Sequence, residues 1–186
     1  MYTKTVCLSS PTMKGTKGVF ELVTLKQLNE NDTHFFTDTL SDVFEHSPWV
    51  AEEAADNRPY KTVEEVHERM VISVEEAEFE DQLTLIRSHP KLGAREKMAP
   101  MSVAEQRKVG LDQLSDEEYE TFLQLNEQYV ETFGFPFIKA VKGQSKDAIV
   151  EAIQRRLLLT KEEEVSTALQ EVYKIAYFRL CDRIQG

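Results

Sequence analysis

The chain has 186 residues, of which 41% are hydrophobic and 30% are charged, so it is long enough to bury a core as one domain. Only 7 Gly and 6 Pro argue against a turn-rich all-β fold, and a formal net charge of -11 argues against nucleic acid, whose phosphates need a basic face. The chain has no apolar run near the ~20 residues of a membrane span and no apolar signal-peptide core near its start, which predicts a cytoplasmic protein that does not bind membranes.

The N-terminal part differs from the rest in composition. Residues 1–20 are rich in Ser, Thr, Gly and Lys and show little periodicity, which predicts a flexible leader. A weak strand signal covers residues 19–24. The remainder, residues 21–186, is expected to form one domain.

Beyond Leu25, apolar residues recur at the three- and four-residue spacing of amphipathic helices. Helices are expected at residues 33–44, 48–55, from 62 onward, 79–88, from 102 onward, from 115 onward, 145–159 and 161–184. The start near Ser115 and the start near Ser102 both resemble capping boxes. The pattern predicts an all-α protein, folded as a single compact multi-helix bundle.

An aromatic corner, residues 133–138, interrupts this helical pattern. Gly134 suits the left-handed conformation that ends a helix, and Pro136 suits the first turn of a following helix. The N–H groups after Pro136, to about Lys139, would then point out of a helix N-terminus and could hold an anion. The three phenylalanines of the corner read equally well as core residues.

The four histidines do not have the spacing of metal ligands. Glu64 and His67 match half of a di-iron helix motif, but no second copy exists, so no metal is expected. His89 stands out because it lies where a helix stops, and Pro90 restricts its backbone. A surface histidine beside a turn is the simpler interpretation, but His89 is also the best-placed group for proton transfer near neutral pH.

Three further polar positions have a structural and a functional interpretation. Ser102 and Glu105 could cap a helix with Gln106 in solvent, or they could line a site near His89. Arg179 lies within an apolar stripe, where it either reaches past the core to solvent or points inward at an anion. Arg155 and Arg156, by contrast, read as exposed helix residues.

A set of short motifs in a fixed order makes the sequence specific. They are His89-Pro90-x-Leu92-Gly93, Ser102-x-x-Glu105-Gln106, Gly110-Leu111-Asp112, Leu125-Asn126-x-x-Tyr129, Phe133-Gly134-Phe135-Pro136-Phe137-Ile138 and Ile175-Ala176-x-x-Arg179-Leu180. From about Leu22 to its end, the chain resembles the OHCU decarboxylase family, which acts on 2-oxo-4-hydroxy-4-carboxy-5-ureidoimidazoline (OHCU). It also resembles the form of this domain that some bacilli fuse to urate oxidase.

The resemblance implies an all-helical, cofactor-free, commonly homodimeric carboxy-lyase that converts OHCU to (S)-allantoin and CO2 in urate degradation, part of purine catabolism. Association with or fusion to urate oxidase is a further implication. His89, Glu105 and Arg179 match catalytic positions, with His89 as proton donor. The positions matching the family's substrate-binding residues are Pro90, Ser102, Val103, Ala104, Glu105, Gln106, Phe137, Ile138, Lys139, Ala140, Val141 and Arg179.

Two alternatives stay open. The chain could be a non-catalytic helical module that stabilises a fused urate oxidase, although a scaffold has no use for His89, Glu105 and Arg179 together. It could also be a different carboxy-lyase or a hydratase that acts on a related ureido acid, since the same polar groups would serve either reaction.

Overall fold

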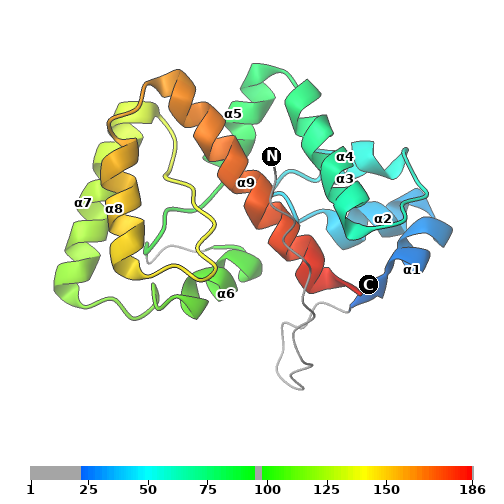
Figure 1. The fold of residues 1–186 in the computed structure, drawn as a ribbon, viewed down its shortest axis with the longest axis horizontal. Helices are drawn as coiled ribbons and strands as arrows, with labels where there is room; N and C mark the ends of the chain where they lie inside the picture. The colour runs from blue at the N-terminus through cyan, green and yellow to red at the C-terminus, as the bar shows by residue number, and fades with distance from the viewer. Residues whose placement is uncertain (1–21, 95–97, 186) are drawn as a thin grey trace. The chain divides into compact units, whose positions relative to one another are not determined.

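The structure is a computed structural model that describes residues 22–94 and 98–185 (Figure 1). Its elements are β1 (Val23–Thr24), α1 (Leu25–Glu30), α2 (Thr33–Leu40), α3 (Trp49–Ala55), α4 (Val63–Glu76), α5 (Phe79–Arg87), α6 (Pro100–Lys108), α7 (Asp116–Phe133), α8 (Lys146–Arg156), α9 (Lys161–Arg183) and β2 (Ile184–Gln185). The helical prediction is confirmed for the described residues. The expected leader, residues 1–20, lies outside them.

The chain divides into two compact units. The first unit runs to Glu76 and resumes at Ala176, and the second unit runs from Ala77 to Ile175. Helix α9 therefore contributes its first part to the second unit and its last part to the first. The single compact bundle expected for the whole domain stays a prediction, and each unit is described by itself.

In the first unit, α2 packs on α3 and α3 packs on α4. The apolar faces of these helices supply a fully buried core that includes Phe36, Leu40, Val50, Val66 and Met70. The weakly predicted strand is present in its described part, where β1 pairs in parallel with β2 and Val23 lies opposite Ile184. This pairing ties the start of the described chain to its end.

In the second unit, α7 and α8 lie side by side (Figure 1). The predicted capping box at the start of α7 is confirmed, because the Ser115 hydroxyl accepts from Glu118 N–H at 3.2 Å while the Glu118 carboxylate accepts from Ser115 N–H at 2.7 Å. The predicted stop is confirmed as well, because Gly134 follows α7 with a φ of 82°. Local sequence signals thus set both ends of the longest helix in this unit.

The prediction for the residues after Gly134 is wrong in one respect. No helix starts at Pro136, and the chain between Pro136 and Val141 has no regular secondary structure before α8 begins at Lys146. The N–H groups of Phe137, Ile138 and Lys139 therefore do not belong to a helix N-terminus. The core role of the phenylalanines is confirmed, because all three are buried and the rings of Phe133 and Phe137 pack on Tyr129 with centroids 4.7 and 5.2 Å away.

Candidate active site

His89 follows the end of α5 directly and is buried, with 7% of its surface exposed. The interpretation as a surface histidine is therefore wrong. Its Nδ1 lies 3.0 Å from the carbonyl oxygen of Leu85, one turn back along α5. Because a carbonyl only accepts hydrogen bonds, Nδ1 carries a proton, and Nε2 is the nitrogen through which the ring can gain or lose one. Pro90, the next residue, is partly exposed.

Gln106 holds the loop that follows His89. Its amide oxygen accepts from Gly93 N–H at 2.8 Å, and its amide nitrogen lies 3.5 Å from the Lys91 carbonyl oxygen and 3.2 Å from the Met98 sulfur. Gly93 has a φ of 73°, a conformation that other residues rarely adopt. Gln106 was read as a solvated residue when Ser102 and Glu105 were read as caps, but it is buried.

The start of α6 also differs from the expected one. The helix begins at Pro100, two residues earlier, and its N-cap makes no side-chain hydrogen bond, so the capping box predicted at Ser102 and Glu105 is absent. Ser102 and Gln106 are four residues apart and both are buried, so they share the inward face of α6. The other residues of this predicted segment are partly or fully exposed: Val103, Ala104 and Glu105.

We expect Gln106→Leu to lower the free energy of unfolding by about 1–3 kcal/mol, because the substitution leaves the buried Gly93 N–H without its acceptor. The midpoint of urea denaturation would measure the change. Arg107→Leu is the matched control, since Arg107 is the exposed neighbour on α6 and its ion pair with Asp112 is at the surface. Equal stability of the two variants would show that Gln106 does not hold the loop.

Helix α7 links this loop to the residues after the aromatic corner. Asn126 donates from its amide to the Leu92 carbonyl oxygen at 2.9 Å. Three residues further along the same helix, Tyr129 packs on Phe137, and residues three apart occupy neighbouring positions on a helix surface. The structure therefore anchors the His89 loop, through Asn126, and the start of segment 137–141, through Tyr129, to one face of α7.

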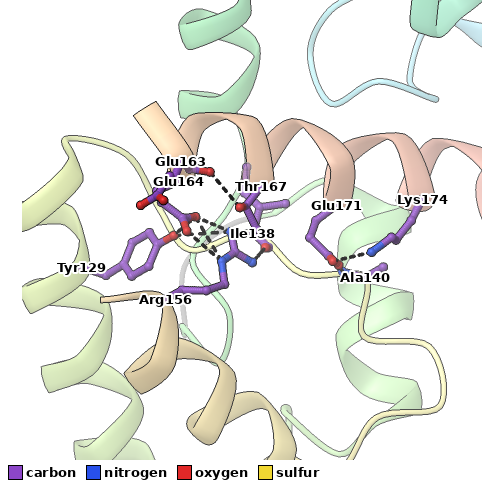
Figure 2. A network of polar contacts seen from close by, with 9 residues as sticks. All are labelled: Tyr129, Ile138, Ala140, Arg156, Glu163, Glu164, Thr167, Glu171 and Lys174. Atoms are coloured by element: carbon purple, nitrogen blue, oxygen red, sulfur yellow. Dashed lines mark hydrogen bonds and ion pairs between the residues drawn. The ribbon is translucent and has the colours of Figure 1, made fainter. Parts of the chain in front are cut away.

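The segment 137–141 is held through its backbone (Figure 2). Arg156, at the end of α8, donates from Nη1 to the Ile138 carbonyl oxygen at 2.7 Å. Glu171, on α9, accepts from Ala140 N–H at 2.9 Å. Phe137, Ile138 and Val141 are buried, whereas Lys139 and Ala140 are partly exposed. Side chains of two later helices thus fix the path of this segment.

Arg156 is buried, so the prediction that it is exposed is wrong, whereas Arg155 is exposed as predicted. Its guanidinium forms an ion pair with Glu164, which also accepts from the Tyr129 hydroxyl. The guanidinium carbon lies 4.5 Å from the centre of the Phe137 ring, a cation–π contact. Burial lowers the pKa of Arg156, but the hydrogen bond to Glu164 and the nearby charges outweigh burial and raise it above the usual value.

Glu171 stays ionised in spite of its burial. Burial raises the pKa of its carboxyl, but the hydrogen bonds from Lys174, at 2.7 Å, and from Ala140 N–H, together with the positive charge of Lys174, bring that pKa below the usual value. Glu171 therefore presents a charged acceptor to the backbone of the segment, which makes a stronger hydrogen bond than a neutral one.

Arg179 belongs to the first unit, whereas His89, Glu105 and the segment 137–141 belong to the second. It is buried, as expected for an arginine that points inward, and its Nη1 donates to the Glu45 carboxylate at 2.8 Å. The same nitrogen lies 3.2 Å from the Asp42 carbonyl oxygen. The structure thus gathers the predicted residues of the second unit around α7 and describes Arg179 with partners of its own unit.

The half-motif of Glu64 and His67 serves another contact in the first unit. Glu64 accepts from the Tyr177 hydroxyl at 2.9 Å, and the His67 ring meets the Tyr177 ring edge-on with centroids 5.2 Å apart. Over residues 22–94 and 98–185, no three His, Cys, Asp or Glu side chains are grouped so that they could hold a metal ion. Within the same ranges, no helix has the length and apolar character needed to cross a bilayer.

A comparison with protein-family models matches residues 29–181 to the model described as OHCU decarboxylase. The chain belongs to this family. The match covers every residue assigned to the candidate site, from His89 to Arg179. The resemblance deduced from the ordered motifs is therefore confirmed.

Two curated relatives show how the chain relates to longer and shorter members of the family. It is 48% identical over 164 residues to the 2-oxo-4-hydroxy-4-carboxy-5-ureidoimidazoline decarboxylase of Haloferax volcanii, which covers 88% of this chain and 98% of that protein. It is 47% identical over 163 residues to the uric acid degradation bifunctional protein PucL of Bacillus subtilis, again over 88% of this chain. The chain spans 33% of the length of the Bacillus protein.

Two solved structures are also similar. A crystal structure of (S)-allantoin synthase superposes with a TM-score of 0.73 at 30% sequence identity, over 88% of this chain and 54% of that chain. An OHCU decarboxylase crystallised in the presence of (S)-allantoin gives a TM-score of 0.64 at 19% identity, over 81% of this chain and 96% of that chain. The second likeness concerns the fold alone.

Proposed function

We propose that this chain is an OHCU decarboxylase that converts OHCU to (S)-allantoin and CO2 in urate degradation. Its membership of the family and its 48% identity to a named decarboxylase along nearly the whole length of that enzyme support the proposal. The observation that carries it in this chain is the buried His89, whose Nδ1 is engaged by Leu85 so that Nε2 is left as the proton-exchanging atom.

The chemistry of the substrate explains why side chains alone could serve. The carboxylate of OHCU is attached to a carbon that also carries a hydroxyl and borders an unsaturated, nitrogen-rich ring. When the carbon–carbon bond breaks and CO2 leaves, its electron pair can enter that ring. The enzyme then has to orient the substrate, place charge and deliver one proton.

His89 is the proposed proton donor. Because the Leu85 carbonyl oxygen retains the Nδ1 proton, the ring delivers a proton from Nε2 of its doubly protonated form and returns to the neutral form that carries hydrogen on Nδ1. Donation to one face of the carbanion would yield one enantiomer of allantoin. Glu105 is proposed to hydrogen-bond the substrate hydroxyl near the departing carboxylate and so to disfavour the charged ground state.

Gln106 and Arg179 have more indirect roles in this proposal. Gln106 was expected to orient the ureido group, but its amide oxygen and nitrogen contact Gly93 and Lys91; we therefore propose that it acts by holding the loop after His89. Arg179 is proposed to contact substrate oxygens that gain charge. Its ion pair with Glu45 supports this role, since a carboxylate already beside the guanidinium weakens a tight pair with the substrate carboxylate, which would stabilise the ground state.

The activity can be tested by generating OHCU in situ from urate with urate oxidase and hydroxyisourate hydrolase. We expect circular dichroism to show accumulation of (S)-allantoin when the purified chain is added. If allantoin forms as a racemate and no faster than by spontaneous decay, the proposal is wrong. That outcome would favour the non-catalytic module, and turnover of a related ureido acid instead would favour the other carboxy-lyase or the hydratase.

The assembly and location of the protein are also proposed from the resemblance. We propose a homodimer that acts in the cytoplasm and is fused to or associated with urate oxidase; the similarity to a bifunctional protein of uric acid degradation supports the last point. Light scattering coupled to size-exclusion chromatography would determine the number of chains per particle.

A further inference from the structure

Two backbone groups of the segment 137–141 are bound by charged side chains, and they flank a single residue. Arg156 binds the carbonyl oxygen of Ile138, and Glu171 binds the N–H of Ala140 (Figure 2). Lys139 is the residue between them. All of these residues belong to the second unit.

The planarity of the peptide bond then sets the direction of the backbone groups of Lys139. Arg58–Pro59 is the only cis bond among the described residues, so both peptide bonds of Lys139 are trans. In a planar trans peptide the C=O and the N–H point in opposite directions. Because the Ile138 carbonyl points at Arg156, the Lys139 N–H points away from Arg156. Because the Ala140 N–H points at Glu171, the Lys139 carbonyl points away from Glu171.

The Lys139 N–H is therefore an oriented donor. It makes no hydrogen bond to any of the residues that the structure describes, and Lys139 is partly exposed. An N–H group held in a fixed direction is suited to bind a carbonyl or carboxylate oxygen of a ligand, because no reorganisation is needed when the ligand binds.

We propose that Arg156 and Glu171 are positioning residues that aim the Lys139 N–H at an oxygen of the substrate. The inference rests on the proposed function and extends it, because it assigns the orientation of the segment to two side chains outside it. Neither residue touches the substrate. The ligand chemistry is that of a urea or imidazolone carbonyl, which accepts one hydrogen bond from the backbone.

The ion pair of Arg156 with Glu164 fits this role better than a role in stability. Buried ion pairs often add little to stability compared with apolar residues of similar size. Here the pair, the Tyr129 hydroxyl and the Phe137 ring surround the guanidinium, so that the group that binds the Ile138 carbonyl oxygen has a fixed position. The network therefore restricts the backbone that it contacts.

The test compares two substitutions of Glu171. Glu171→Leu removes the acceptor of the Ala140 N–H, whereas Glu171→Gln keeps an oxygen there. We expect Glu171→Leu to lower kcat/KM for OHCU about tenfold, the equivalent of about one hydrogen bond of 1.4 kcal/mol. Glu171→Gln should stay within about threefold of the unchanged enzyme. Lys174→Met is the matched control, because it removes the ion pair of Glu171 and leaves the bond to Ala140.

A second readout reports the Lys139 N–H itself. On titration with (S)-allantoin, the amide resonance of Lys139 should shift in the unchanged protein and in Lys174→Met, and should shift much less in Glu171→Leu. Thermal melting followed by circular dichroism identifies any variant that has lost its fold. In that case the comparison of Glu171→Gln with the unchanged protein decides, through the size of the Lys139 shift.

The outcomes separate the two proposals. An unchanged enzyme that makes no (S)-allantoin contradicts the proposed function, and the inference fails with it. An active enzyme in which Glu171→Leu is folded and has normal kcat/KM contradicts the positioning role alone. A Lys139 resonance that ignores (S)-allantoin in the active enzyme contradicts it as well.

Discussion

Replacement of His89 by alanine should remove most of the turnover of OHCU and leave the helical fold in place. General acid–base groups contribute about 100- to 10,000-fold to rates, and we expect a loss of kcat in that range. The structural cost is smaller, because the imidazole bonds through Nδ1 to a carbonyl of its own helix, and loss of such a bond costs about 1–3 kcal/mol. A domain of this size typically has a free energy of unfolding of about 5–15 kcal/mol.

The measurement is the initial rate of (S)-allantoin formation at saturating OHCU, with the far-ultraviolet circular dichroism spectrum as a check on the fold. His34→Ala is the matched control, since the side chain of His34 is 83% exposed and lies in the first unit; it should retain full activity. A folded His89→Ala enzyme with unchanged turnover would sink the assignment of His89 as proton donor.

Features that depend on neighbouring residues were predictable from the sequence. Helix α7 begins at its capping box and ends at Gly134 as predicted, because both signals act within one turn of the chain. Helix α3 likewise follows Pro48 and ends at Ala55. The helices themselves follow from the spacing of their apolar residues, which one chain segment carries alone.

The two prolines expected near helix starts show where local signals fail. Pro100 begins α6, whereas Pro136 begins no helix, although both satisfy the preference of proline for a first turn. After Pro136 the backbone is bound by Arg156 and Glu171, and these bonds join residues 18 and 31 positions apart in the chain. Partners so distant leave no pattern near Pro136.

The buried state of Arg156 could have been predicted. Ile149, Ile153 and Arg156 are four and three residues apart, and all three share the buried face of α8. A charged residue in line with such a stripe points into the core, where it needs a partner of opposite charge. The identity of that partner, Glu164 on the next helix, depends on how α8 and α9 pack, and the spacing within α8 does not contain it.

Arg156→Met should lower the free energy of unfolding by about 3–5 kcal/mol, because it leaves the buried carboxylate of Glu164 without its countercharge. It also removes the donor to the Ile138 carbonyl oxygen. Urea denaturation followed by circular dichroism would measure the loss. Arg155→Met, which changes the exposed neighbour on the same helix, should alter stability by less than about 0.5 kcal/mol.

The double variant Arg156→Met with Glu164→Gln separates charge from geometry. Neutralising both partners removes the uncompensated buried charge, and the glutamine oxygen can still accept from the Tyr129 hydroxyl, so much of the lost stability should return. Activity should not return with it, since the Ile138 carbonyl oxygen still lacks its donor and the Lys139 N–H is no longer aimed. A double variant that recovers both stability and kcat/KM would mean that Arg156 acts through its charge alone, and a single variant as stable as the unchanged protein would mean that Glu164 does not depend on it.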